Sequence, residues 1–404
     1  MIIDFTVENF LSIKQAQSVY FNVTNKDFLN DSARELLNNL KCNTITTLIG
    51  NNASGKTNML RALAFLLWSA KYSYESKRGI TMDVVPHKLS SSSISSFTIH
   101  FEKQGKEYEY VLKLSPKQLE YEFLGVKKTR GYSYLYEVQR RNGKLNIVKW
   151  ASVLGKLNQY DKERFLSMHP CSFFAFLLST GHLNRVGLNN LYVFKSNVGQ
   201  IGKGIEHPFE ILVKEYTNLK KDERKKQRIE QFLQECDLAF SGFEFEEKTI
   251  PDPENENKER KMVSLKVKHK IQNKEFSLSL LQESNGTQHL VSLLDRVFNV
   301  LDVGGILIWD EIEDSLHPYL ARKVLQLFTS KALNPLNAQL IFTTHAPLLL
   351  DNCTKTQIYL VEKNAQLASD IFCLADVEGV RNTDNFAAKY LTGTYGAVPT
   401  GRWF

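Results

Sequence analysis

Residues 45–57 read ITTLIGNNASGKT, and this short stretch decides the fold. Its first five residues are apolar or β-branched, which is typical of a buried strand. The next eight fit the pattern G-x-x-x-x-G-K-[ST] at every fixed position, and a helical run follows over 58–70. A strand, a glycine-rich turn and a helix in this order predict a loop whose backbone amides wrap around phosphate groups.

The residues of this loop each have an expected part in holding a nucleotide. Its glycines let the backbone approach a phosphate closely, and the positive end of the following helix adds to the attraction. Lys56 is expected to reach the β- and γ-phosphates, while the Thr57 hydroxyl is expected to ligate Mg²⁺. A glycine turn followed by a chance Lys-Thr pair is the alternative, and the flanking strand and helix speak against it. The expected nucleotide-binding residues are Gly50, Asn51, Asn52, Ala53, Ser54, Gly55, Lys56, Thr57 and Asn58.

A second apolar run, 306–309, ends in two acids, Asp310 and Glu311. Carboxylates at the C-terminal end of a buried strand face the crevice where parallel sheets bind ligands. We therefore expect Asp310 to hold the Mg²⁺ ion and Glu311 to orient or deprotonate the attacking water. Alone, the two acids could be the solvated start of a loop. Together with the phosphate-binding loop they indicate a nucleoside triphosphate site.

Two further motifs stand at the ends of predicted elements. His345 closes the predicted strand 339–343, where a neutral imidazole could accept a hydrogen bond from the water or donate one to the phosphate. A lone histidine is otherwise more often a packing or surface residue. Residues 283–288 read ESNGTQ and precede a predicted helix over 287–300. Ser and Gly at a helix start form an anion site, although such a start is common by itself.

The composition is that of an ordinary globular protein. Of the 404 residues, 43% are hydrophobic and 24% charged. No window reaches the roughly 18 apolar residues of a membrane-spanning helix, and the start does not resemble a secretory signal. Five scattered cysteines without a C-x-x-C pair favour reduced thiols and a cytoplasmic location. The net charge of +7 permits a nucleic-acid partner without requiring one.

The rest of the sequence divides where its pattern changes. We predict the N-terminal half of an ATPase core over 1–94 and an antiparallel β subdomain over 95–150, where apolar residues alternate. A mainly helical insertion is predicted over 151–261, and the C-terminal half of the core over 262–404.

Smaller features refine this division. Asn142-Gly143 predicts a type I′ hairpin turn. Residues 214–235 predict a helix or a short helical hairpin with a narrow apolar stripe. The Pro-rich, charged stretch 251–261 is the best loop candidate. The tyrosines of the β subdomain favour sheet packing over base stacking.

In this order, the four motifs resemble the ABC-type ATPase heads of the SMC, RecF and OLD-like families. Residues 50–57 resemble the Walker A motif, 284–288 the signature, 306–311 the Walker B motif and His345 the switch histidine. Residues 310–318, DEIEDSLHP, are similar to the form found in OLD-like and AAA15-type ATPases.

Both ends of the chain extend the resemblance. Residues 5–12, FTVENFLS, and residues 390–399, YLTGTYGAVP, resemble the corresponding segments of the same ATPases. The AAA15 group, which includes ATPase components of bacterial abortive-infection and related defence modules, is the closest in sequence pattern. A glutamine loop has no clear counterpart, and residues 82–89 are only a candidate for it.

The resemblance implies an α/β fold, a P-loop NTPase of ABC-ATPase type with a mixed sheet core and an antiparallel β subdomain. It implies ATP and Mg²⁺ as cofactors, with Glu311 and His345 as catalytic residues and Thr57 and Asp310 as metal ligands. It also implies a homodimer, in which the signature of one copy caps the γ-phosphate bound to the Walker A motif of the other. The signature residues are Ser284, Gly286, Thr287 and Gln288.

The output of such an ATPase stays open at the level of sequence. One reading is the sensor and regulator of a prokaryotic defence module that controls a separate effector nuclease or toxin. The alternative is a RecF-like DNA-repair ATPase, for which the basic run 220–226 could contact phosphates or could equally be a solvated helix face. A third reading, a nuclease with its own Toprim domain, is disfavoured because only 59 residues follow His345.

Overall fold

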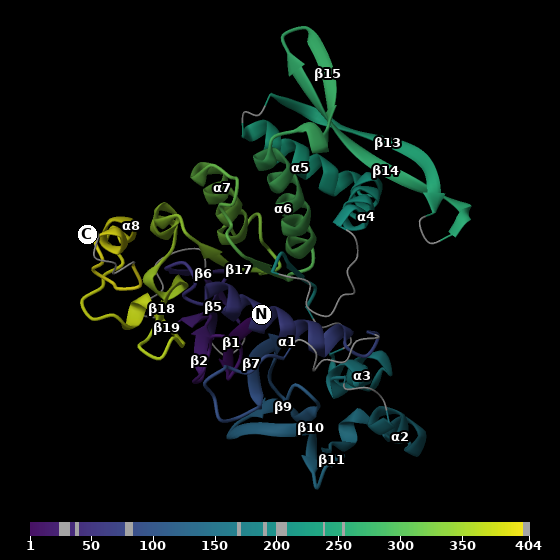
Figure 1. Cartoon of the computed structure of the whole chain (residues 1–404), viewed down its shortest axis with the longest axis vertical. Helices are drawn as coiled ribbons and strands as arrows, with labels where there is room; N and C mark the ends of the chain where they lie inside the picture. Colours follow the sequence, from purple (N-terminus) through teal and green to yellow (C-terminus); the bar gives the residue numbers. More distant parts are fainter. Residues whose placement is uncertain are drawn as a thin grey trace. The chain divides into compact units, whose positions relative to one another are not determined.

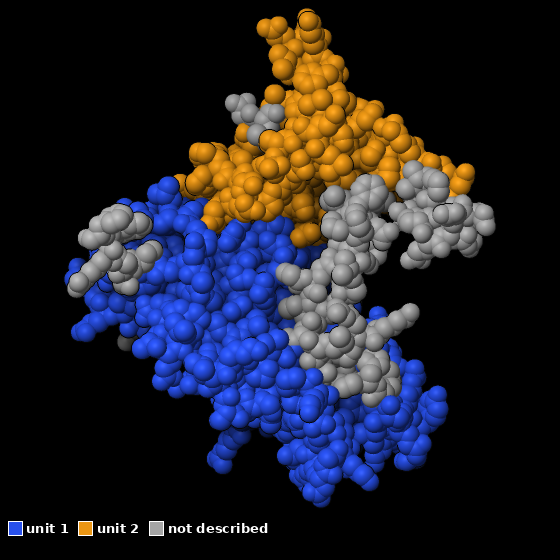
Figure 2. All heavy atoms as spheres, in the orientation of Figure 1, with its two compact units in different colours: residues 1–203, 300–312, 325–404 blue, residues 204–299, 313–324 orange. Residues whose placement is uncertain are grey.

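The computed structural model divides the chain into two compact units. Unit 1 comprises residues 1–203, 300–312 and 325–404, and unit 2 comprises residues 204–299 and 313–324 (Figure 2). These units divide the chain differently from the predicted boundaries at 94, 150 and 261. The structure describes residues 1–23, 33–36, 40–76, 84–167, 171–188, 192–198, 208–236, 239–252 and 255–398.

A six-stranded sheet in unit 1 carries the predicted buried strands. Its order is β12-β16-β17-β6-β18-β19, with all neighbours parallel except the antiparallel pair β18–β19. The strands are β6 (Ile45–Gly50), β12 (Phe194–Ser196), β16 (Ile306–Trp309), β17 (Gln339–Thr344), β18 (Ile358–Lys363) and β19 (Ser369–Cys373). Because β6, β16 and β17 are buried along their whole length, they read as continuous apolar runs, as predicted.

A seven-stranded antiparallel sheet forms the second layer of unit 1, in the order β11-β10-β9-β8-β7-β1-β2. Its strands are β1 (Ile2–Glu8), β2 (Gln17–Tyr20), β7 (Ser95–Lys103), β8 (Lys106–Leu114), β9 (Leu119–Lys128), β10 (Gly131–Arg141) and β11 (Lys144–Trp150). The predicted hairpin at Asn142-Gly143 joins β10 to β11, and both residues have positive φ, 50° and 75°. A type I′ turn requires this backbone.

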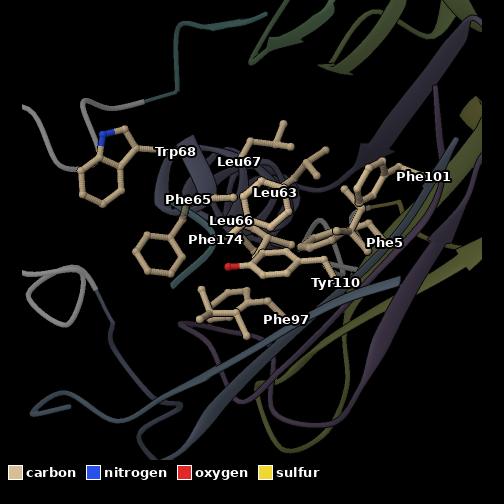
Figure 3. Close-up of a cluster of buried hydrophobic side chains, with 14 of the residues drawn as sticks. Phe5, Leu63, Phe65, Leu66, Leu67, Trp68, Phe97, Phe101, Tyr110 and Phe174 are labelled. Atoms are coloured by element: carbon tan, nitrogen blue, oxygen red, sulfur yellow. The ribbon is translucent and has the colours of Figure 1, made fainter. Parts of the chain in front are cut away.

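Helix α1 (Lys56–Tyr72) packs against strands of both sheets. It is buried on nearly all sides, and a helix that is apolar all round is expected to lie inside the core. Figure 3 shows its residues Leu63, Phe65 and Leu67 in one cluster with Phe5 and Phe97 of the antiparallel sheet. The start of α1 is therefore held between the two layers (Figure 1).

A buried carboxylate ties helix α3 (Phe173–Ser179) to the antiparallel sheet. Glu122 on β9 accepts hydrogen bonds from the amides of Phe173 and Phe174 at 2.7 and 2.8 Å, and from the hydroxyls of Tyr110 and Tyr136 at 3.1 and 3.0 Å. Burial raises the pKa of Glu122, while the amides of the helix lower it. Tyr110 and Tyr136 are fully buried, in keeping with the predicted packing role of the tyrosines.

The short elements of unit 1 complete its edges. They are β3 (Asn22–Val23), β4 (Ala33–Glu35), β5 (Lys41–Asn43), α2 (Gln159–Ser167) and α8 (Phe386–Leu391). All five cysteines are free. Among the described helices, none has the length and apolar character needed to cross a lipid bilayer.

Unit 2 joins helices to a three-stranded antiparallel sheet of order β13-β14-β15. Its elements are α4 (Pro208–Lys221), α5 (Glu223–Glu235), β13 (Phe240–Asp252), β14 (Asn255–Ile271), β15 (Lys274–Ser279) and α6 (Asn285–Leu301); α7 (Pro318–Thr329) begins here. The predicted helical hairpin over 214–235 is confirmed as α4 and α5. Lys225 of α5 and Asp295 of α6 form a buried ion pair at 2.7 Å, which fastens the two helices.

The predicted loop over 251–261 is wrong. Strand β13 extends to Asp252 and β14 begins at Asn255, so most of this stretch is paired in a long hairpin. Its charged residues lack strand propensity, but cross-strand pairing outweighs local propensity in a sheet. The mainly helical character predicted for 151–261 accordingly gives way to strand from Phe240 onward.

A histidine bound to two acids lies on the antiparallel sheet. His100 Nδ1 is 2.6 Å from Asp4 Oδ1, and its Nε2 is 3.5 Å from Glu109 Oε1. Burial by itself lowers the pKa of His100, but the hydrogen bonds and charges of the two carboxylates outweigh it and raise the pKa to about 9. The ring is therefore charged at neutral pH and links three neighbouring strands.

We expect the contribution of His100 to stability to depend on pH. Because its folded-state pKa lies above the ordinary value of about 6.5, the stabilisation is complete below that value and is lost as the pH rises through 9. His100→Gln should lower the free energy of unfolding by about 1–2 kcal/mol at pH 6, since solvent partly screens the pair. Denaturant unfolding of both proteins at pH 6 and pH 9.5 measures this. An equal loss at both pH values would contradict it.

Candidate nucleotide-binding site

The loop between β6 and α1 is folded as a phosphate-binding loop. Lys56 is 5% exposed, and its Nζ donates to the carbonyl oxygens of Gly50 and Asn51, both at 2.9 Å. Gly55 has φ +115°, a backbone conformation that residues with a Cβ rarely adopt. The lysine is thus folded back over its own loop. In the first turn of α1, the amides of Asn58 and Met59 donate to the carbonyl of Gly55 at 3.0 and 3.1 Å.

Two serines that lie far from the loop in the sequence stabilise it through hydrogen bonds. Ser369 Oγ donates to the carbonyl of Ser54 at 2.6 Å and lies 2.7 Å from Ser12 Oγ, which accepts from Asn58 Nδ2 at 2.8 Å. A Cβ on Gly55 would lie 2.0 Å from Ser369 Oγ, so glycine is required for this approach. The amide of Asn58 therefore faces this support.

Asp310, directly after β16, reaches the loop from the neighbouring part of the sheet. Its carboxylate accepts hydrogen bonds from Thr57 Oγ1 at 2.9 Å and from Thr343 Oγ1 at 2.6 Å. Asn197, which follows β12, holds the backbone on the other side: its Nδ2 donates to Asp310 O at 2.9 Å, and its Oδ1 accepts from Asp310 N at 2.7 Å. Asp310 is thus held from the start of α1, from β17 and from the residue after β12.

Glu311 and His345 lie side by side at the same end of the sheet. His345 Nε2 is 3.5 Å from Glu311 Oε1, and the two side chains are 36% and 53% exposed. The amide of Glu311 donates to Thr343 Oγ1 at 2.7 Å, and the residue has φ 53°, which is uncommon for a non-glycine residue. Such a backbone turns the carboxylate away from the strand direction, and strain of this kind is frequent at functional sites.

The predicted signature forms the start of α6, within unit 2. Ser284 Oγ accepts from Thr287 N at 3.1 Å and lies 2.9 Å from Thr287 Oγ1, which caps the helix. A Cβ on Gly286 would lie 2.6 Å from the carbonyl of Ser315, so the helix start packs tightly on the segment after Glu311. Gln288 Nε2 bonds the carbonyl of Glu283 at 2.8 Å.

The residues of the loop fit a bound triphosphate. Asn51 Oδ1 and Ser54 Oγ are buried polar atoms with no hydrogen-bond partner among the described residues. Buried polar groups are normally paired, and a phosphate brought into the loop would offer an acceptor to the Ser54 hydroxyl. Asn51 Oδ1 is itself an acceptor, so its partner would have to be a donor. The Thr57 hydroxyl beside the Asp310 carboxylate is the hard oxygen pair that Mg²⁺ prefers.

Four residues of this arrangement were not singled out from the sequence for the site: Asn197, Thr343, Ser12 and Ser369. Thr343 stood next to His345 in a noted motif, and its position in the strand was the available signal. The other three are polar residues at strand or turn ends without a motif, and only the packing of β1, β12 and β19 against the loop brings them in.

The candidate glutamine loop, 82–89, lies partly outside the described residues, which resume at Val84. Leu11 N donates to Val85 O at 2.7 Å, and His87 N donates to Asn9 Oδ1 at 3.0 Å. These bonds place 84–89 against the turn after β1.

Comparisons with known proteins bear on the family and the fold of this chain. The family described as "AAA domain, putative AbiEii toxin, Type IV TA system" matches residues 45–351. Among solved structures, the SMC head bound to the C-winged helix domain of ScpA is similar, with 14% identity, 92% of this chain and 96% of that chain covered, and a TM-score of 0.50. The SMC head domain from Thermotoga maritima is 14% identical, with 92% and 98% covered and a TM-score of 0.43.

No curated protein matches this chain. At 14% identity, the likeness to the ScpA-bound SMC head concerns the fold alone. Together with the family match, it confirms the predicted fold class of an α/β P-loop NTPase of the ABC/SMC-like type.

The serine support predicts a specific effect on nucleotide affinity. Ser369→Ala removes the hydrogen bond to Ser54 O, and one such bond corresponds to about 0.5–1.5 kcal/mol, so ATP should bind roughly 2–10-fold more weakly. Titration with a fluorescent ATP analogue measures this. Ser18→Ala is the matched control, because Ser18 forms a similar hydroxyl pair, 2.7 Å from Thr6 Oγ1, and has no hydrogen bond to the loop among the residues that the structure describes. Equal weakening in both variants would contradict the support role.

Proposed function

This chain belongs to the AAA domain family that matches its residues 45–351, and we propose that it is an ATPase whose heads dimerise on ATP and act as a switch. One observation carries the proposal: Thr57, at the end of the phosphate-binding loop, hydrogen-bonds Asp310, which lies 253 residues further along the chain. Glu311 and His345 stand at the same end of the sheet. A loop for phosphates, a carboxylate for metal and an acid beside a histidine are the parts that ATP hydrolysis requires.

Each residue has a proposed part in binding or hydrolysis. When ATP binds, Lys56 exchanges its hydrogen bonds to the carbonyls of Gly50 and Asn51 for contacts with the β- and γ-phosphates. Phosphate oxygens carry more negative charge than a carbonyl oxygen and therefore bind the ammonium group more strongly. Thr57 and Asp310 would hold Mg²⁺, which neutralises phosphate charge when bound. Glu311 orients the attacking water, and His345 contacts the γ-phosphate or that water.

The dimer follows from the second half of the site. The start of α6 presents Ser284 and the first amides of the helix at its positive end, and Thr287 N already donates to Ser284 Oγ. The positive end of a helix is an anion-binding arrangement. We propose that this start caps the γ-phosphate held by a second copy, so that two copies close around two ATP molecules with two-fold symmetry. ATP then stabilises the dimer and hydrolysis releases it.

For the output, we favour regulation of a separate effector nuclease or toxin in a cytoplasmic defence module, as the family description and the resemblance to abortive-infection ATPases suggest. A RecF-like ATPase that acts through DNA binding is the second candidate, favoured by the net charge of +7. An effector or toxin gene in the adjoining reading frame would support the first. Salt-sensitive DNA binding by the isolated protein, stimulated by ATP, would support the second.

Lys56→Ala should strongly weaken ATP binding. The lysine is the cation of the phosphate-binding loop, and a charged hydrogen bond corresponds to about 1.5–3 kcal/mol, so the affinity should fall roughly 10–150-fold. Isothermal titration with ATP and Mg²⁺ measures this. Lys117→Ala, at an exposed hairpin turn, should bind as the wild type does. Unchanged affinity in Lys56→Ala would exclude the loop as the ATP site.

Glu311→Gln should bind ATP, hydrolyse it at least about 100-fold more slowly and accumulate as a dimer. The amide keeps the size of the side chain but cannot accept a proton from water. Light scattering after gel filtration, with and without ATP, distinguishes the two states. A variant that binds ATP yet stays monomeric at micromolar concentration would refute the closed dimer while leaving ATP binding intact.

A further inference from the structure

The positive charge of the chain is concentrated in unit 1. Its sequence has 33 Lys and Arg residues against 24 Asp and Glu, whereas unit 2 has 18 against 20. Residues 95–150 alone, which form β7–β11, have 11 Lys and Arg against 6 acids. The basic run 220–226 therefore belongs to a unit without net positive charge, and the surplus lies on the antiparallel sheet.

Two neighbouring hairpins bring five of these cations to one end of that sheet. The β7–β8 turn carries Lys103 and Lys106, and the β9–β10 turn carries Lys127, Lys128 and Arg130. The two turns lie side by side because β8 and β9 are adjacent, with Tyr108 paired to Val126.

The acids at this end do not neutralise the cations. Glu107 is 3.5 Å from Lys127 and also accepts the hydroxyl of Tyr132. Glu102 Oε1 accepts from Gly105 N, inside its own turn, at 2.8 Å. Among the described residues, Lys106, Lys128 and Arg130 are exposed and have no ion pair.

The fold holds these like charges close together. Lys103 on β7 is paired directly with Lys106 on β8. Burial lowers the pKa of Lys103, and the charge of Lys71 at the end of α1 lowers it further, whereas Glu102 acts in the opposite direction. Like charges on adjacent strands destabilise a sheet, so a bound polyanion would relieve a repulsion that the free protein carries.

We propose that the tips of the β7–β8 and β9–β10 hairpins bind the phosphate backbone of a nucleic acid through Lys106, Lys128 and Arg130. Cations that project from narrow hairpin tips suit the regularly spaced phosphates of a polynucleotide. The intervening tip residues, Gln104, Gly105 and Thr129, are polar, whereas a lipid-binding surface would need apolar side chains there. Tyr134 on β10, four residues after Arg130, is 45% exposed and adds a ring near the β9–β10 tip.

The proposal goes beyond the proposed ATPase, because the tips share no residue with the nucleotide site. Failure of the nucleic-acid proposal would therefore leave the proposed ATPase function intact, and the reverse also holds. The Lys56→Ala variant should bind nucleic acid as tightly as the wild type when no nucleotide is added. Loss of DNA binding in that variant would place the DNA contact at the phosphate-binding loop and overturn the assignment to the tips.

The test is fluorescence anisotropy of the full chain with a labelled 30-base-pair DNA duplex, across salt concentrations from 50 to 200 mM. The wild type should bind with an affinity that falls steeply with salt. The triple variant K106Q/K128Q/R130Q should bind about 10–100-fold more weakly at low salt, with a log–log salt slope reduced by about 2–3, since each lost phosphate contact removes about 0.9.

The matched control is K117Q/R141Q/K144Q, which removes the same charge from the hairpin turns at the opposite end of the same sheet. It should change the affinity by less than about threefold. Thermal unfolding and ATP binding should be unchanged in both triple variants. Absence of salt-dependent binding by the wild type would overturn the proposal, as would equal losses in both variants. So would binding of labelled polyglutamate without binding of DNA, which would indicate an acidic protein partner instead.

Discussion

The hydrogen bond between Thr57 and Asp310 is the contact on which the rest of the site depends. It joins the loop after β6 to the end of β16, although β17 lies between these strands in the sheet. Thr343, at the end of β17, completes the connection by donating to the same carboxylate. The ends of β16 and β17 thus meet the start of α1, which follows β6, because the C-terminal ends of parallel strands lie at one edge of the sheet.

The rigidity of this point comes from α1. A helix buried on nearly every side cannot shift without opening cavities in both sheets, and such cavities destabilise a core strongly. Its first turn is consequently a fixed platform for the amides that would meet a phosphate. Ser12, in the turn between β1 and β2, and Ser369, on β19, add hydrogen bonds to the loop and to Asn58. These bonds further restrict the movement of the loop.

The two units divide the chemistry between them. Unit 1 contains the phosphate-binding loop, both acids and the histidine, whereas unit 2 contains the helix start proposed to act on a second copy. Asn197 stands where the chain leaves the sheet of unit 1 for unit 2, and it holds the backbone of Asp310 from both sides. The basic hairpin tips of the antiparallel sheet use a different part of unit 1 and do not draw on these residues.

The sequence by itself determined the motifs and the strands that carry them. The runs 45–49, 306–309 and 339–343 consist of apolar residues and threonine apart from Gln339, as buried parallel strands mostly do, so their positions and the loop at 50–57 could be read directly from the sequence. Only the tertiary structure decided which polar residues support the site. Asn197 follows β12, Ser12 lies in the turn after β1 and Ser369 begins β19, and their hydrogen bonds depend on which strands become neighbours. The charged strands 240–252 and 255–271 were also not predictable from the sequence. Whether such a segment forms a strand depends on the residues of the strand that it pairs with, and these lie elsewhere in the sequence.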